Sequence, residues 1–315
     1  MVRRLICKQA NRGRVPASRD FVSILALAVV LDTIVGEPPA VLHPVVWIGR
    51  LLDALERRAP TQPGARLAYG ALMAIGVPLA WACLAGLAQR GLPWPLQVFV
   101  LKPTFAGRAL LDASSRIEAA LQRDDLPAAR LALRALVSRP TQELGPSLAA
   151  DAAIESLAEN LVDSWVAPLL AYAAGGLPLA YAYRAANTAD AMWGYRGQRY
   201  EHLGKAAARL DDVLNWVPAR LAAVLICWIS GAPWRALRVW RRDACRTASP
   251  NAGQSMSAAG GALDVRLEKT GHYVLNAEAR TPSASDIRLA QRLIGRAMVV
   301  SAGAALGLSR MRSRA

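Results

Sequence analysis

The amino-acid sequence predicts an all-α, polytopic integral membrane protein with about four to six membrane segments and amphipathic helices outside the membrane. Three observations lead to this fold class. The 315-residue chain is 54% hydrophobic yet carries a net charge of +15, it contains a long run without any charge, and its basic residues concentrate between the apolar runs. Apolar spans joined by basic loops account for all three.

The clearest span is residues 67–88, LAYGALMAIGVPLAWACLAGLA, which contains 22 residues and no charge. About 20 apolar residues are enough to cross the hydrocarbon core. Shorter or partly charged candidates are residues 21–36, 92–111, 161–183, 213–234 and 293–308. Residues 21–36 would reach only about 24 Å as a helix, against a core of about 30 Å. We therefore expect an uncleaved membrane segment behind a basic leader of residues 1–20. If it crosses fully, the basic loop at residues 50–66 contradicts the positive-inside rule, and a partial or re-entrant segment removes that conflict.

Between the spans, the pattern predicts helices and loops within a single membrane-embedded domain of residues 1–315. Residues 106–137 have helical periodicity interrupted at Pro127, with Asp125 placed to cap the second helix, so we expect residues 106–160 to be an extramembrane helical segment. Residues 184–212 are expected to form a polar catalytic loop and residues 235–292 a basic extramembrane segment. Within the latter, the small and polar stretch SPNAGQSMSAAGG, residues 249–261, predicts a loop.

Composition argues against several classes of protein. The chain has no zinc-ligand spacing, no RNA-binding aromatic motif and no basic reading helix, so anionic lipid explains the positive charge better than nucleic acid does. Its four cysteines are scattered and form no CxxC pair, which indicates neither a disulfide framework nor a zinc site.

Four acids at a spacing of four residues are the first chemical signal. Asp151, Glu155, Glu159 and Asp163 would share one face of a helix, and no basic residue follows them until Arg184. One interpretation is a solvated helix face. The other is a functional site, because residues 164–183 carry no charge and a carboxylate inside a span costs about 2.5–3.5 kcal/mol. Mg²⁺ would relieve both burial and mutual repulsion.

A second signal follows in residues 183–221, YRAANTADAMWGYRGQRYEHLGKAAARLDDVLNWVPARL. Acids alternate there with arginines and a lysine. This mixture suits a phosphate-bearing substrate, because acids hold Mg²⁺ and arginines contact phosphate oxygens. A salt-bridged loop at the membrane surface would have the same composition.

These two tracts, together with LDTIVGEPPAVLHPVVWIGRLL (residues 31–52) and SPNAG (residues 249–253), resemble the membrane-bound adenosylcobinamide-phosphate synthase family of cobalamin biosynthesis, the CbiB/CobD proteins. The resemblance runs in order from about residue 31 to residue 292. It implies an ATP-dependent acid–amine ligase that joins adenosylcobyric acid, a corrinoid, to aminopropanol or aminopropanol phosphate. It also implies Mg²⁺, ATP as co-substrate, and a multi-pass location in the cytoplasmic (inner) membrane. Membrane lipid is an expected partner, other corrin-assembly enzymes are candidates, and nucleic acid is not.

The resemblance and the two signals together give the expected site residues. Those expected to be catalytic are Glu155, Glu159, Asp163, Asp190, Glu201 and His202. Those expected to bind substrate are His43, Asn187, Arg196, Tyr200, Asn251 and Gly253. Those expected to bind metal are Asp211 and Asp212. His202 is the candidate general base, or else a packed histidine. The turn that contains Glu37 and His43 either faces the site or is a rigid re-entry loop, and SPNAG either contacts phosphate or is a simple turn.

Three departures from the family pattern point to altered amine preference or weaker catalysis. Pro140 stands where the family has an aspartate, Gln254-Ser255-Met256 replaces Trp-Pro-Glu, and residues 268–282 match only loosely. The alternative functions are a membrane transporter of a corrinoid or other anionic solute, a lipid phosphotransferase, and a non-catalytic subunit for corrin assembly.

Overall fold

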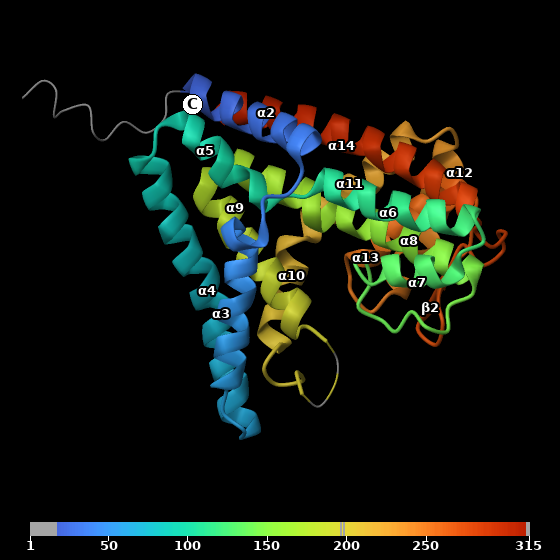
Figure 1. Ribbon diagram of the computed structural model, residues 1–315, viewed down its shortest axis with the longest axis horizontal. Helices are drawn as coiled ribbons and strands as arrows, with labels where there is room; N and C mark the ends of the chain where they lie inside the picture. The colour runs from blue at the N-terminus through green and yellow to red at the C-terminus, as the bar shows by residue number, and fades with distance from the viewer. Residues whose placement is uncertain (1–17, 196, 198, 313–315) are drawn as a thin grey trace, which may run out of the picture. The chain divides into compact units, whose positions relative to one another are not determined.

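The computed structural model describes residues 18–195, 197 and 199–312 (Figure 1). The predicted leader falls almost wholly outside this range, and Arg196 also lies outside it. The chain forms two compact units. The first comprises Met1–Phe105, Pro168–Asp211 and Ala304–Ala315, and the second comprises Ala106–Ala167 and Asp212–Gly303. The described residues are overwhelmingly helical, with one short hairpin, which confirms the predicted all-α class.

The first unit is built from N-terminal helices and the segment around the second polar tract. Its elements are α2 (Ser18–Val35), η1 (Ala40–Leu42), α3 (Pro44–Arg57), α4 (Pro63–Gly91), α5 (Trp94–Leu101), η2 (Lys102–Thr104), most of α9 (Ala167–Trp193) and of α10 (Lys205–Leu214), and the end of α14 (Ala284–Arg312). A buried cluster that includes Ile48, Leu52, Trp193 and Leu203 joins α3 and α4 to both ends of the polar tract. This core fixes where the tract lies. Much of residues 184–212 is therefore helical and not loop.

The second unit contains the acidic helix. Its elements are α6 (Gly107–Gln122), α7 (Leu126–Leu133), α8 (Pro146–Leu161), the π-turn η3 (Val162–Val166), α11 (Trp216–Ile229), α12 (Pro233–Asp243), η4 (Ala244–Arg246), α13 (Ala252–Leu263), β1 (Leu267–Lys269), β2 (Tyr273–Leu275) and most of α14. Helix α13 packs against α8, α11 and α12. It is therefore the central helix of this unit.

Within the described residues, three helical segments are long and apolar enough to cross a membrane: Pro63–Gly91, Pro146–Trp193 and Ala284–Arg312. The bent pair Lys205–Leu214 and Trp216–Ile229 would be a fourth if it forms one span. The candidate at residues 92–111 is not one span, since it breaks into α5, η2 and α6. Pro103 and the extended backbone of Phe105 interrupt it.

Helix α9 also has a break, at Gly176, whose φ is 72°. Pro178 follows two residues later and cannot donate a helical hydrogen bond. The Leu177 N–H is satisfied instead by the side chain of Gln89, whose Oε1 accepts it at 2.8 Å. A substitute partner of this kind is what lets an interrupted helix persist in an apolar setting.

The helices at residues 106–137 confirm the sequence prediction closely. Pro127 is in the first turn of α7, where its missing N–H costs nothing. Asp125 caps this helix, and its Oδ1 accepts the Ala128 N–H at 3.0 Å.

The predicted loop at residues 249–261 was wrong, because α13 begins at Ala252. Residues 253–261 are all buried. A Cβ atom at Gly261 would meet Val239, Ala236 and the Arg235 carbonyl. The small residues of this segment therefore allow neighbouring helices to pack closely. Composition alone does not distinguish such a helix from a flexible loop, because both are rich in small residues.

Candidate active site

The acidic helix α8 borders a small polar pocket of about 110 Å³ in the second unit. Glu155 and Glu159 both line it, as the four-residue spacing predicts. Glu155 is buried and Glu159 is exposed. The remaining lining residues are Leu136, Val137, Ser138, Arg139, Ala152, Ser156, Lys269 and Tyr273. The pocket thus combines two carboxylates with two cations and a phenol.

Arg139 forms the closest polar contact in this pocket. Its Nη2 donates to Glu155 Oε2 at 3.0 Å, and both side chains are mostly buried. The other oxygen, Glu155 Oε1, is buried and has no donor at full hydrogen-bond geometry within the part of the chain that the structure describes, although the Tyr273 hydroxyl interacts with this carboxylate. A buried carboxylate oxygen normally has a donor, so this atom is a place where a ligand N–H would be stabilised.

The β-hairpin provides the opposite wall. Lys269 and Tyr273 are paired across β1 and β2, and both line the pocket. The hairpin is attached to α8 because Asp151 Oδ2 accepts the Glu268 N–H at 2.7 Å. Burial, and then the negative charge of Glu155, raise the pKa of Tyr273 far above its ordinary value. Its hydroxyl therefore stays protonated and remains a hydrogen-bond donor beside the carboxylate.

Asp163, the last acid of the series, lies in the π-turn η3 and is half-buried. It is not among the residues that line the pocket. The change from α-helix to π-turn after Leu161 adds a residue to the turn, which shifts Asp163 away from the face that Glu155 and Glu159 share. The structure therefore groups Glu155 and Glu159 at the pocket, whereas Asp151 holds the hairpin and Asp163 lies off the pocket.

In the first unit, the second polar tract brings Asn187 and Asp211 together. Both side chains are buried, and Asn187 Nδ2 donates to Asp211 Oδ1 at 3.2 Å. Arg184 Nη1 donates to Asn187 Oδ1, also at 3.2 Å. Arg184, Asn187 and Asp211 thus form one chain of hydrogen bonds between α9 and α10.

The other predicted residues of this tract are more exposed. Asp190 is half-buried near the end of α9, where its carbonyl accepts the Gly194 N–H at 2.6 Å. Tyr200 and His202 are half-buried and Glu201 is exposed, between α9 and α10. The structure therefore does not group Glu201 with the buried Asn187–Asp211 pair.

In the SPNAG loop, the residues expected to contact phosphate are hydrogen-bonded to neighbouring parts of the second unit. Asn251 Nδ2 donates to the Asp212 carbonyl at 2.8 Å, while its Oδ1 accepts from Arg220 at 3.2 Å. The Gly253 N–H donates to Thr247 Oγ1 at 3.0 Å. A phosphate at this loop would have to replace these bonds. Gly253 has a packing role as well, because a Cβ atom there would collide with the Ala244 carbonyl.

The N-terminal motif forms a buried ionic network in the first unit. Lys102 Nζ lies 3.0 Å from Asp32 Oδ1 and 2.5 Å from Glu37 Oε1, and Glu37 Oε2 lies 2.9 Å from His43 Nε2. Burial alone would raise the pKa of Glu37, but the hydrogen bonds with His43 and Lys102 outweigh it and lower that pKa below its ordinary value. Glu37 is therefore held ionised at neutral pH. Glu37 and His43 are therefore paired with each other in this turn, and whether the turn faces a substrate stays a prediction.

Carboxylates are the right donors for Mg²⁺, which needs only one or two of them when water and substrate phosphates complete its shell. Asp211 and Asp212 are consecutive on α10, so their side chains diverge by about 100°. Asp211 contacts Asn187, whereas Ser249 Oγ donates to Asp212 Oδ1 at 3.3 Å. Each carboxylate offers oxygen ligands of the type that Mg²⁺ prefers, Asp211 beside Asn187 and Asp212 beside Ser249. In the described part of the chain, no three His, Cys, Asp or Glu side chains cluster as a metal site.

Sequence reasoning missed four residues of these sites: Arg139, Lys269, Tyr273 and Lys102. Arg139 precedes the acids by more than a helical turn, and the hairpin residues lie over 100 positions beyond them, so periodicity does not connect them. Lys102 gave a usable signal, since it is an isolated lysine after the apolar run WPLQVFVL.

Comparison with known proteins places these features in a family. A model of the CobD/CbiB protein family matches residues 25–300. A probable cobalamin biosynthesis protein CobD of Methanothrix thermoacetophila is 40% identical over 304 residues, covering 89% of this chain and 94% of the relative. Cobalamin biosynthesis protein CbiB of Salmonella typhimurium is 39% identical over 263 residues, covering 78% and 82%. Cobalamin biosynthesis protein CobD of Dehalococcoides mccartyi is 40% identical over 273 residues, covering 83% and 88%.

No solved structure matches the chain significantly. The family match extends over most of the chain and includes residues 31–52, 151–163, 183–221 and 249–253. The chain therefore belongs to the CobD/CbiB family of membrane proteins.

Proposed function

We propose that this protein, which has a role in cobalamin biosynthesis, catalyses the ATP-dependent ligation of a corrinoid carboxylate, that of adenosylcobyric acid, to the amine of aminopropanol or its phosphate. Family membership supports the role in the pathway. The observation that carries the reaction is the polar pocket on α8, where a buried carboxylate oxygen of Glu155 has no donor at full hydrogen-bond geometry and two cations are adjacent.

The pocket has the size and charge for the amine and not for the corrinoid. At about 110 Å³ it holds a small molecule only. An ammonium group would donate to Glu155 Oε1 and to Glu159, which are the acidic groups of the wall. Because an amine attacks only after losing a proton, one carboxylate must also accept that proton. Glu159 is suited to this task, since it is exposed and can pass the proton to water.

The two cations and the phenol of the pocket would interact with negative charge on the reacting substrate. Arg139 and Lys269 would stabilise negative charge that develops on the carbonyl oxygen or on a phosphoryl group, and Tyr273 would donate a hydrogen bond to the same region. When bound, Mg-ATP would supply the activation of the poorly reactive carboxylate as an acyl phosphate. Asp211 with Asn187, and Asp212 with Ser249, are the carboxylate positions we propose for Mg²⁺.

The location we propose is the cytoplasmic membrane, with the nucleotide-dependent step on the cytoplasmic side. Three or four candidate spans support a membrane position. Basic residues of α12, in the segment 235–292, would then lie on the cytoplasmic side, as the positive-inside rule requires.

The test is amide formation by the purified protein in detergent with adenosylcobyric acid, Mg-ATP and either amine, followed by mass spectrometry. Glu159→Gln should lower kcat at least tenfold at neutral pH. Glu143→Gln, an exposed acid of the same unit outside the pocket, is the matched control and should keep wild-type activity. Equal activity in both variants would remove Glu159 from the reaction. Product formation without ATP would refute the ligase mechanism.

A further inference from the structure

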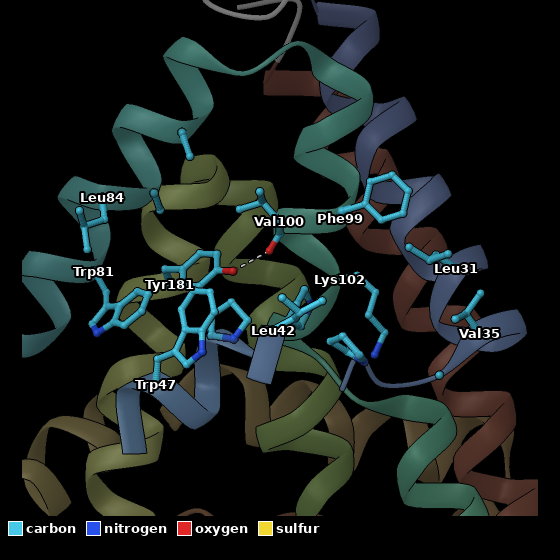
Figure 2. A pocket seen from close by; sticks show the side chains of 16 residues that line it. Leu31, Val35, Leu42, Trp47, Trp81, Leu84, Phe99, Val100, Lys102 and Tyr181 are labelled. Carbon is cyan, nitrogen blue, oxygen red and sulfur yellow. Dashed lines mark hydrogen bonds between the residues drawn. The ribbon is translucent and has the colours of Figure 1, made fainter. Parts of the chain in front are cut away.

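A second and larger pocket, of about 470 Å³, lies in the first unit (Figure 2). It is bordered by α2, α3, α4, α5 and α9 together with the turn after α2. Figure 2 shows Trp47, Trp81 and Tyr181 on one side and Phe99, Leu31 and Val35 on the other, with Lys102 near the turn. The proposed amide ligation does not use this pocket.

Tyr181, Trp47 and Lys102, three polar members of the lining, are already bonded inside the protein. Tyr181 donates its hydroxyl to the Val100 carbonyl at 2.7 Å (Figure 2), and the Trp47 indole N–H donates to the Val41 carbonyl at 2.8 Å. Lys102 is 3% exposed and is ion-paired with Asp32 and Glu37. The wall therefore presents carbon almost exclusively, so a ligand would be recognised by hydrocarbon alone.

The rim of the pocket is continuous with the surface that faces the bilayer. Leu72, Ile75, Leu79 and Leu87 are more than half exposed along the uncharged run of helix α4, the clearest candidate span. Leu84 belongs to this exposed face and also lines the pocket. The pocket rim contains further exposed apolar side chains: Val35, Leu42, Trp47 and Phe99. The medium in contact with this opening is therefore acyl chain and not water.

The volume matches a single chain. An apolar cavity of about 150 Å³ holds one benzene molecule. The present pocket is about three times larger, which leaves room for roughly 18 carbon atoms. This is the size of one lipid tail and is too small for a corrin ring system with its side chains.

We propose that this pocket binds one acyl chain of a membrane phospholipid as a defined site. Occupation covers the side of the pocket that Lys102 lines and keeps water away from the ion pairs of Lys102 with Asp32 and Glu37. The proposal is independent of the ligase reaction, because it rests on the first unit alone.

The test is native mass spectrometry of protein purified in a mild detergent and released from its micelles in the gas phase. Wild type should retain one phospholipid, identified by its mass and fragments. Ala88→Phe fills the pocket from α4 and should reduce the retained fraction at least fivefold. Ala80→Phe, the same change at an exposed position of α4 outside the pocket, is the control and should retain the lipid. Leu84→Trp, at the exposed rim, is a second blocking variant and should also reduce the retained fraction.

A second readout uses vesicles of phosphatidylcholine brominated in the middle of both chains. Bromine quenches tryptophan fluorescence on contact. The quenching of Trp81 is obtained as the difference between each protein and the same protein with Trp81→Phe. This quenching should be smaller in Ala88→Phe than in Ala80→Phe. Equal lipid retention and equal quenching in the two alanine variants would overturn the proposal. A retained free fatty acid in place of phospholipid would overturn the proposed source of the chain.

Discussion

Replacing Lys102 with methionine tests whether the buried network of the N-terminal motif stabilises the fold through charge compensation. The change keeps most of the side-chain length and removes the cation. Asp32, which is fully buried, would lose its cationic partner Lys102 at 3.0 Å, while Glu37 would keep His43 and is 26% exposed. Most of the cost therefore comes from Asp32.

Removing one member of a buried ion pair typically costs 3–5 kcal/mol, because the remaining charge is left uncompensated. We expect about 3–4 kcal/mol for Lys102→Met, at the lower end because Glu37 retains a partner. Adding Asp32→Asn removes the stranded charge and should recover about 2 kcal/mol.

The assay is reversible unfolding in mixed micelles of increasing dodecyl sulfate content, followed by tryptophan fluorescence and circular dichroism. Wild type, both single variants and the double variant form a double-mutant cycle. The reasoning is refuted if Lys102→Met costs less than about 1 kcal/mol, or if the cycle gives a coupling energy near zero.

Three further predictions concern stability in the same assay. Folding lowers the pKa of Glu37, so its ionised form stabilises the folded protein fully at pH values above the pKa of the unfolded state. This stabilisation is lost as the pH falls through the pKa of the folded state. Below roughly pH 5, the wild-type protein should therefore lose more stability than the Glu37→Gln variant. Gly261→Ala should cost about 1–3 kcal/mol by overpacking, whereas Gly295→Ala, which has open space on its helix, should be neutral or slightly stabilising. Asp125→Ala should cost about 1 kcal/mol through the lost cap, and an unchanged unfolding midpoint would show that the cap contributes nothing.

Local patterns predicted the parts of the structure that depend on local physics. The uncharged run in α4, the cap at Asp125 and the shared face of Glu155 and Glu159 follow from composition and helical geometry. Small residues misled the prediction at α13, because the same residues suit a loop and a tightly packed helix.

The parts that could not be predicted depend on contacts between distant segments. Arg139 reaches Glu155 only because α8 folds back toward the segment after α7. Lys269 and Tyr273 reach the pocket through a hairpin whose sequence matched the family pattern only loosely. A single sequence does not show which distant segments are in contact. Residue type alone therefore did not identify Arg139, Lys269 and Tyr273 as pocket residues.

The hairpin that closes the small pocket has a consequence for how the pocket can diversify. Two strands of three residues each have little stability of their own, and the Asp151 carboxylate holds them against the acidic helix. The short connection between Lys269 and Tyr273 can change in length or chemistry without disturbing a single helix–helix contact. If the small pocket binds the amine as proposed, its specificity can be altered by changing a few residues of this connection.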